Sequence, residues 1–221
     1  MTFREWFETW GGPGSGNFGH AGRKGKGPGG SMPGGSYVIR DVKDALYSKV
    51  LEDKTPFDIH GTRKGREYAI VINPDGSTKE YTGEGEDSEM RFSDEELKSM
   101  RDTDFIHTHP SGSSFSLDDI RIASHTHMNS MQAVGVDYEG RGWLYTMKPG
   151  ASRSWPSEGM IFAEHGTQER AIYSRNNAKL SEMTLSEQRA AIPELNHTHA
   201  HDIWTQVAAS LGMRYSREEI K

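Results

Sequence analysis

Residues 104–120, Asp-Phe-Ile-His-Thr-His-Pro-Ser-Gly-Ser-Ser-Phe-Ser-Leu-Asp-Asp-Ile, contain the pattern that decides the fold. The first six, 104–109, read as a strand. On a strand, His107 and His109 stand two positions apart, so both side chains leave the same face of the sheet. Pro110 ends the strand because it has no N–H to donate to a neighbouring strand. Two imidazoles at this spacing can chelate one metal ion.

A second pattern lies beyond the Ser- and Gly-rich loop. Ser116-x-x-Asp119 is a helix-opening capping box, and the helix is expected to run to about Met131. Asp119 would then supply a third ligand next to His107 and His109. Two His and one carboxylate leave a fourth position open, which is typical of catalytic zinc. The same Ser and Asp also serve as ordinary helix-capping residues, so a purely structural interpretation stays open.

The His-Thr-His sequence occurs three times, at 107–109, 125–127 and 197–199. The second copy falls in the predicted helix, where its two histidines would stand about 200° apart and could not share a face. We expect them to be surface or packing residues. In the third copy, His197 lies four residues before His201, and we expect a solvated helix entrance there because no acid is placed to complete a metal site.

The remaining pattern predicts a mixed α/β or α+β fold. Strands are expected where β-branched and aromatic residues gather, and helices where apolar residues recur every three or four positions. The predicted strands are 67–73, 77–84, 132–138 and 142–148, and the predicted helices are 41–52, a short one opened by Ser93-x-x-Glu96, 166–180, 184–192 and 198–211.

The amino-acid composition limits the kinds of catalytic and metal site that the chain can form. The 221 residues include no Cys, which excludes disulfides, thiolate metal sites and a cysteine nucleophile, whereas ten His leave a metal site on His and carboxylates open. The formal net charge is −6. No stretch approaches the roughly 18 apolar residues of a membrane span, and the acidic N-terminus does not resemble a signal peptide. We therefore expect a soluble protein with no membrane partner, located in the cytoplasm or packaged in a particle assembled there.

Four segments are expected along the chain. Residues 1–10 carry aromatic side chains at helical spacing and predict a short helix, and residues 11–35 hold 12 of the 25 Gly and predict a flexible linker. Residues 36–150 form the main domain and 151–221 a helical extension. The linker is basic, but its few charges predict at most weak contact with nucleic acid.

His107-x-His109-Pro110 followed by Ser116-x-x-Asp119 resembles the signature of the JAMM (MPN-type) zinc metalloproteases and of the related RadC-type domain. This resemblance implies that residues 36–150 form a cytidine-deaminase-like β-α-β sandwich. It also implies that Zn²⁺ is held by His107, His109 and Asp119, and that Ser116 stabilises the oxyanion of the tetrahedral intermediate. The loop from His109 to Ser116 is one residue shorter than is usual in the family.

The family pattern also includes an upstream Glu that acts as the general base. Glu67 fits this place because it opens the hydrophobic segment Glu-Tyr-Ala-Ile-Val-Ile-Asn. The competing acids Glu80, Glu84, Glu86 and Glu89 lie in a polar stretch and read more easily as solvated charges.

The resemblance implies a zinc-dependent peptidase or isopeptidase acting on a protein or peptide. Zinc lowers the pKa of a bound water to about 7 from 15.7, which supplies hydroxide at neutral pH. The Gly-rich tract also resembles tracts in phage head-assembly proteins, which suggests phage structural proteins as partners and a location in the host cytoplasm or virion. Two alternatives stay open: an HxH metal-dependent phosphoesterase, and a non-catalytic virion-associated or interaction module.

Overall fold

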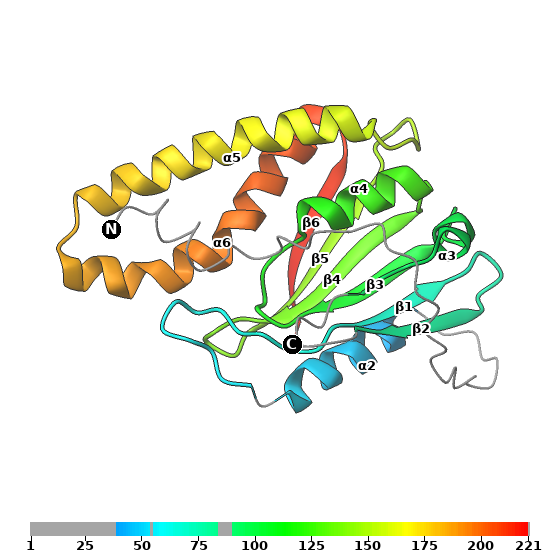
Figure 1. The fold of residues 1–221 in the computed structure, drawn as a ribbon, viewed down its shortest axis with the longest axis horizontal. Helices are drawn as coiled ribbons and strands as arrows, with labels where there is room; N and C mark the ends of the chain where they lie inside the picture. The colour runs from blue at the N-terminus through cyan, green and yellow to red at the C-terminus, as the bar shows by residue number, and fades with distance from the viewer. Residues whose placement is uncertain (1–38, 54, 84–89, 221) are drawn as a thin grey trace.

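A computed structural model describes residues 39–53, 55–83 and 90–220 of the chain. Its centre is a six-stranded mixed sheet with the strand order β2-β1-β3-β4-β5-β6 (Figure 1). The strands are β1 (Tyr68–Ile72), β2 (Thr78–Thr82), β3 (Asp104–His109), β4 (Ser130–Val136), β5 (Gly142–Lys148) and β6 (Arg214–Ile220). The helices are α2 (Ile39–Glu52), α3 (Asp94–Ser99), α4 (Leu117–Thr126), α5 (Glu158–Ser181) and α6 (Leu185–Leu211).

One pair of strands in this sheet is parallel. β3 and β4 run side by side in the same direction, whereas β1 pairs antiparallel with both β2 and β3, and β5 pairs antiparallel with both β4 and β6. Parallel neighbours need a crossover connection, and α4 provides it between β3 and β4. The loop that enters this crossover therefore starts where β3 ends, directly after His109.

Helices cover both faces of the sheet (Figure 1). Successive side chains of β3 point to opposite faces. Ile106 packs with Val42 and Leu46 of α2, whereas Phe105 belongs to the larger core formed with α4, α5 and α6. His107 has the same parity as Phe105 and shares its face. The predicted mixed α/β class is confirmed, while the cytidine-deaminase-like identity of the sandwich stays a prediction.

The C-terminal part of the chain differs from the helical extension expected for residues 151–221. Residues 214–220 form β6, which pairs with β5 and adds a sixth strand to the sheet. The expected helices at 184–192 and 198–211 are one continuous helix, α6, with Pro193 in its interior. Pro193 packs so closely on Gly61 that a Cβ added at Gly61 would lie 2.8 Å from Pro193 Cβ. Pro193 has no N–H, so α6 lacks one helical hydrogen bond at this position, and the contact with Gly61 is made at the same residue.

The crossover helix is shorter than expected. α4 ends at Thr126 rather than near Met131, because His127 adopts a left-handed conformation with φ 57° and caps the helix. Met128 then turns into the core, where it is 1 % exposed. Both predicted capping boxes are present, at Ser93 with Glu96 and at Ser116 with Asp119.

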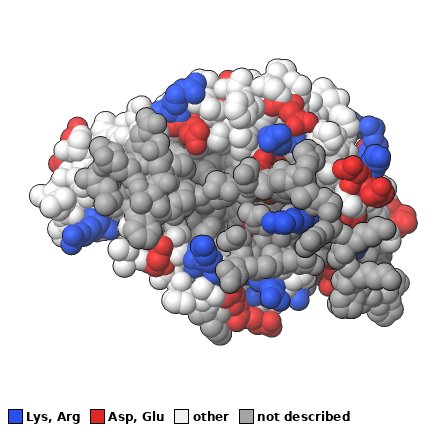
Figure 2. Space-filling view, viewed as in Figure 1, with Lys and Arg blue, Asp and Glu red and all other residues white. Residues whose placement is uncertain are grey.

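The predicted aromatic helix at 1–10 and the linker at 11–35 lie outside the described residues. Within the described part of the chain, no helix is both long enough and apolar enough to cross a membrane. On the face shown in Figure 2, Lys and Arg side chains are interspersed with Asp and Glu side chains.

Candidate metal centre

The structure brings three of the predicted site residues together. His107 and His109 project from the end of β3, and Asp119 projects from the first turn of α4. One potential ligand atom from each lies within 4.8 Å of the others. His107 Nε2 is 3.5 Å from Asp119 Oδ1, and His109 Nε2 is 3.4 Å from Asp119 Oδ2. The two carboxylate oxygens of Asp119 thus face different imidazoles.

The capping box at the start of α4 orients Asp119. The Asp119 backbone N–H donates to Ser116 Oγ at 3.1 Å, and the Ser116 backbone N–H donates to Asp119 Oδ2 at 2.7 Å. The Ser116 hydroxyl also donates to Asp119 Oδ2 at 2.8 Å. Asp119 therefore caps the helix and faces the histidines at the same time, so the helix cap and the candidate ligand set share this residue.

The two histidines have different surroundings. The Nδ1–H of His109 can donate to the Ser113 carbonyl at 3.1 Å, which leaves Nε2 to face Asp119. His107 is 1 % exposed, and neither of its ring nitrogens has a hydrogen-bond partner among the described residues. Buried polar atoms usually have a partner. A metal ion next to Nε2 would give His107 one.

Charge interactions within this group are strong. Burial opposes protonation of His109, but hydrogen bonding and attraction to Asp119, followed by attraction to Glu67, outweigh it and raise the pKa of His109 to about 9. Burial also opposes ionisation of Asp119, but the two histidines hold the pKa of its carboxyl well below the usual range. A metal ion would therefore have to displace a proton from His109, because a ligating imidazole must be deprotonated.

Glu67 lies on the same face of the sheet as the two histidines. It directly precedes β1, and its carbonyl accepts a hydrogen bond from the Gly83 N–H, so the ladder between β1 and β2 continues to it. Ala69 pairs with His107 at the end of the β1–β3 ladder, and Glu67 lies two residues before Ala69, so alternation gives it the same side as Ala69 and His107. The negative charge of Glu67 contributes to the raised pKa of His109. The structure thus puts a carboxylate beside the ligand group, and its role as a base stays a prediction.

The competing acids are less well placed or not described. Glu80 is exposed on β2 and pairs with Ile70, whose side chain packs toward α2. Directly paired residues share a face, so Glu80 points away from the face of His107. Glu84, Glu86 and Glu89 lie outside the described residues.

The other two His-Thr-His copies are not part of this group. His125 is exposed, and its Nδ1 lies within hydrogen-bond distance of Glu158 Oε1 at 2.9 Å, which agrees with the expected surface role. The solvated helix entrance expected at His197 is wrong, because α6 continues through Pro193 and buries His197 at 3 % exposure. Its Nε2 contacts Arg217 Nη2 at 2.6 Å.

Two glycines that sequence reasoning did not single out bring the loop after β3 against β4. Gly112 has a φ of 72°, and a Cβ added there would lie 2.5 Å from the Val136 carbonyl oxygen. A Cβ added at Gly135 would lie 2.6 Å from Gly112 Cα. The sequence signal for Gly112 is its position two residues after Pro110 in a turn, and the signal for Gly135 is an isolated glycine inside a strand pattern, which indicates a close backbone approach.

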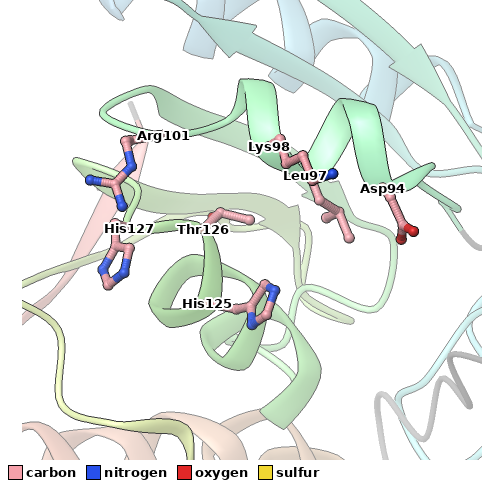
Figure 3. Close-up of a pocket in the computed structure, with 7 residues that line it drawn as sticks. All are labelled: Asp94, Leu97, Lys98, Arg101, His125, Thr126 and His127. Atoms are coloured by element: carbon pink, nitrogen blue, oxygen red, sulfur yellow. The ribbon is translucent and has the colours of Figure 1, made fainter.

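A hollow in the surface is lined by residues that do not belong to the metal group. It has a volume of about 300 Å³ and is formed where α3 and α4 end (Figure 3). Lys98 and Arg101 lie at the end of α3, where a positive charge interacts favourably with the helix dipole. The lining residues are Asp94, Leu97, Lys98, Arg101, His125, Thr126 and His127.

Comparison with known proteins identifies no relative of the chain. No protein-family model, no curated protein and no solved structure matches the chain.

Proposed function

We propose that this protein is a zinc-dependent peptidase or isopeptidase of the JAMM type. The observation that carries the proposal is the convergence of His107, His109 and Asp119, whose ligand atoms lie within 4.8 Å of one another. Two imidazoles and a carboxylate suit zinc and leave a position for water or substrate. The buried ring nitrogens of His107, which have no hydrogen-bond partner among the described residues, support the same conclusion.

When bound, a zinc ion in such a site supplies a Lewis acid and activates water for attack on a carbonyl carbon. In our proposal, Glu67 accepts a proton from the attacking water and then delivers it to the leaving amine as the C–N bond breaks. Ser116 positions Asp119 through the capping box, and in the reaction its single hydroxyl hydrogen would turn from Asp119 Oδ2 to the oxyanion, while the Ser116 backbone N–H keeps Asp119 in place. Ser113 fixes the tautomer of His109 by accepting from Nδ1–H.

The ligand set favours this chemistry over phosphoester hydrolysis. HxH phosphoesterases hold two or three metal ions and need more ligands than three. Among the described residues, His107, His109 and Asp119 form the single group of three or more clustered metal-ligating side chains. The substrate class that follows is a protein or peptide, and the proposed setting is phage or prophage morphogenesis, with phage structural proteins as partners.

Zinc analysis of the purified chain tests the metal centre. We expect about one zinc per chain in the wild type and loss of that zinc in His107→Ala and His109→Ala. His125→Ala is the matched control, because this exposed histidine belongs to the same sequence pattern and lies at the far end of α4. A wild-type chain without stoichiometric zinc would contradict the enzyme proposal and favour a non-catalytic interaction module.

Digestion of a peptide library tests the reaction. Glu67→Gln should keep zinc and lose hydrolysis, because the amide cannot accept the proton. Glu80→Gln, on the opposite face of the sheet, should retain activity. Full activity in Glu67→Gln would assign the base role to another acid.

A further inference from the structure

The loop between the metal-ligating histidines and α4 is held by side chains from distant parts of the chain. Gly112 O accepts from the Tyr145 hydroxyl at 2.9 Å, and Phe115 O accepts from Trp204 Nε1 at 2.7 Å. The Pro110 carbonyl accepts from Arg63 Nε. Backbone carbonyls along this loop are thus paired with donors on β5, on α6 and in the segment before β1.

These contacts converge on Ser113, whose carbonyl faces His109 Nδ1. The residue before it, Gly112, is held by Tyr145. The residue after it, Ser114, has its hydroxyl 2.7 Å from the Tyr215 hydroxyl. Tyr145 therefore anchors the peptide group that precedes Ser113, and Tyr215 holds the side chain of Ser114 directly after it, so the direction of the Ser113 carbonyl between them is restricted.

The two tyrosines lie on rigid elements. Tyr145 is on β5 and fully buried, and Tyr215 is on β6, where its hydroxyl also lies 2.9 Å from His201 Nδ1 of α6. Both rings contact Phe115 edge-on, with centroids 6.5 and 6.3 Å from its ring. Without the Tyr145 hydroxyl, the Gly112 carbonyl would lose its donor in a site that water reaches poorly.

We propose that Tyr145 and Tyr215 are positioning residues of the metal centre. They hold the loop on both sides of Ser113, so that the Ser113 carbonyl keeps His109 in the tautomer and ring orientation that metal binding requires. The inference rests on the proposed zinc function and extends the centre to β5 and β6. Groups that orient a metal-ligating histidine typically contribute 10–100-fold to metal affinity or activity.

The test compares zinc affinity in variants that each lose one hydroxyl. In Tyr145→Phe and Tyr215→Phe, we expect about tenfold weaker zinc binding, at the low end of the range for such partners. Ser124→Ala is the control, because it loses a hydroxyl that donates to the Pro156 carbonyl at 2.7 Å on the far part of α4. It should bind zinc as the wild type does.

Zinc dissociation constants are measured by competition with a chromogenic chelator, at a temperature where circular dichroism shows every variant folded. Cobalt substitution gives a second readout, because a displaced His109 should alter the visible absorption of bound Co²⁺. A role limited to stability would leave both readouts unchanged. If Tyr145→Phe does not fold, Tyr215→Phe alone is used for the test. Tyr215 is a half-buried side chain on the edge strand β6, so loss of its hydroxyl should disturb folding less.

Tyrosine variants that bind zinc as tightly as the wild type, with an unchanged cobalt spectrum, would overturn the inference and leave the proposed function intact. A wild-type chain that binds no zinc would overturn both. The two failures are therefore distinguishable by the wild-type measurement alone.

Discussion

Replacing Gly112 with alanine should displace the loop that connects the histidine ligands to Asp119. The φ of 72° at Gly112 lies in the left-handed region, which disfavours residues that have a Cβ. The added Cβ would also lie 2.5 Å from Val136 O and 2.7 Å from Asp137 N. Both are backbone atoms at the end of β4, which is an interior strand, and cannot rotate away, so the loop itself must move off β4.

Gly140 offers a control that separates the clash from the backbone strain. Its φ is 82°, and no described atom lies within 4 Å of an added Cβ. Gly140→Ala should therefore cost only the left-handed strain of about 1–2 kcal/mol. Gly112→Ala adds overpacking of about 1–3 kcal/mol, for a total of about 2–5 kcal/mol. The entropy that alanine removes from the unfolded chain is common to both variants and cancels in the comparison.

Urea denaturation gives the free energy of unfolding of both variants, and a zinc titration reports the state of the site. We expect Gly112→Ala to be the less stable variant and to bind zinc more weakly, whereas Gly140→Ala should bind zinc normally. Equal free energies of unfolding in the two variants, together with normal zinc affinity in Gly112→Ala, would refute the reasoning.

Three further outcomes are expected. Ser116→Ala should lose about 1 kcal/mol of stability, measured by denaturant titration, and should bind zinc more weakly, because Asp119 loses its orienting hydroxyl. The control is Ser93→Ala, which breaks the equivalent capping box on α3 and should lose similar stability with no change in zinc affinity. Chelation should lower the free energy of unfolding by about 4 kcal/mol if free zinc beforehand was about 1,000 times its dissociation constant, and calorimetry in buffer with and without chelator checks this. In metal-free protein, burial lowers the pKa of His109 but the interaction with Asp119 outweighs it, so the pKa is about 9 in the folded state and 6.5 in the unfolded state. The stability that protonated His109 contributes is therefore complete below pH 6.5 and is lost as the pH rises to 9. That loss is about 3 kcal/mol, and equal stability at pH 6.5 and 9.5 in the presence of chelator would contradict it.

The parts of the site that the sequence predicts are those specified over short distances. His107 and His109 share a face because strand alternation has a period of two, and Asp119 reaches them because one capping box starts the next helix. The donors that hold the loop could not be predicted in this way. Trp204 lies 89 residues from its partner, and no local pattern connects the two.

The errors in the predicted fold have similar causes. The sequence does not predict β6, because Arg214–Ile220 is polar and alternates weakly, so it becomes a strand only by pairing with β5. The sequence predicts two helices in place of α6, because a proline usually ends a helix, whereas Pro193 lies inside α6 and packs on Gly61. The sequence predicts an α4 that is too long, because His127 ends the helix in a left-handed conformation that histidine rarely adopts. In each case a tertiary contact or a rare backbone conformation outweighed the local preference.

The distant anchors of the loop also set the order in which the centre can form. The three candidate ligands lie within 13 residues and leave the ribosome almost together. Arg63 precedes its partner Pro110, but the other three groups that hold their loop follow 33, 89 and 101 residues after their partners, at Tyr145, Trp204 and Tyr215. Contacts of such long sequence separation carry a loop-closure entropy cost and form slowly, and they cannot form before their second partner is synthesised. A nascent chain would therefore expose histidines and a carboxylate able to meet zinc well before the loop between them is fixed, and the mature geometry would arise only when β6 joins the sheet.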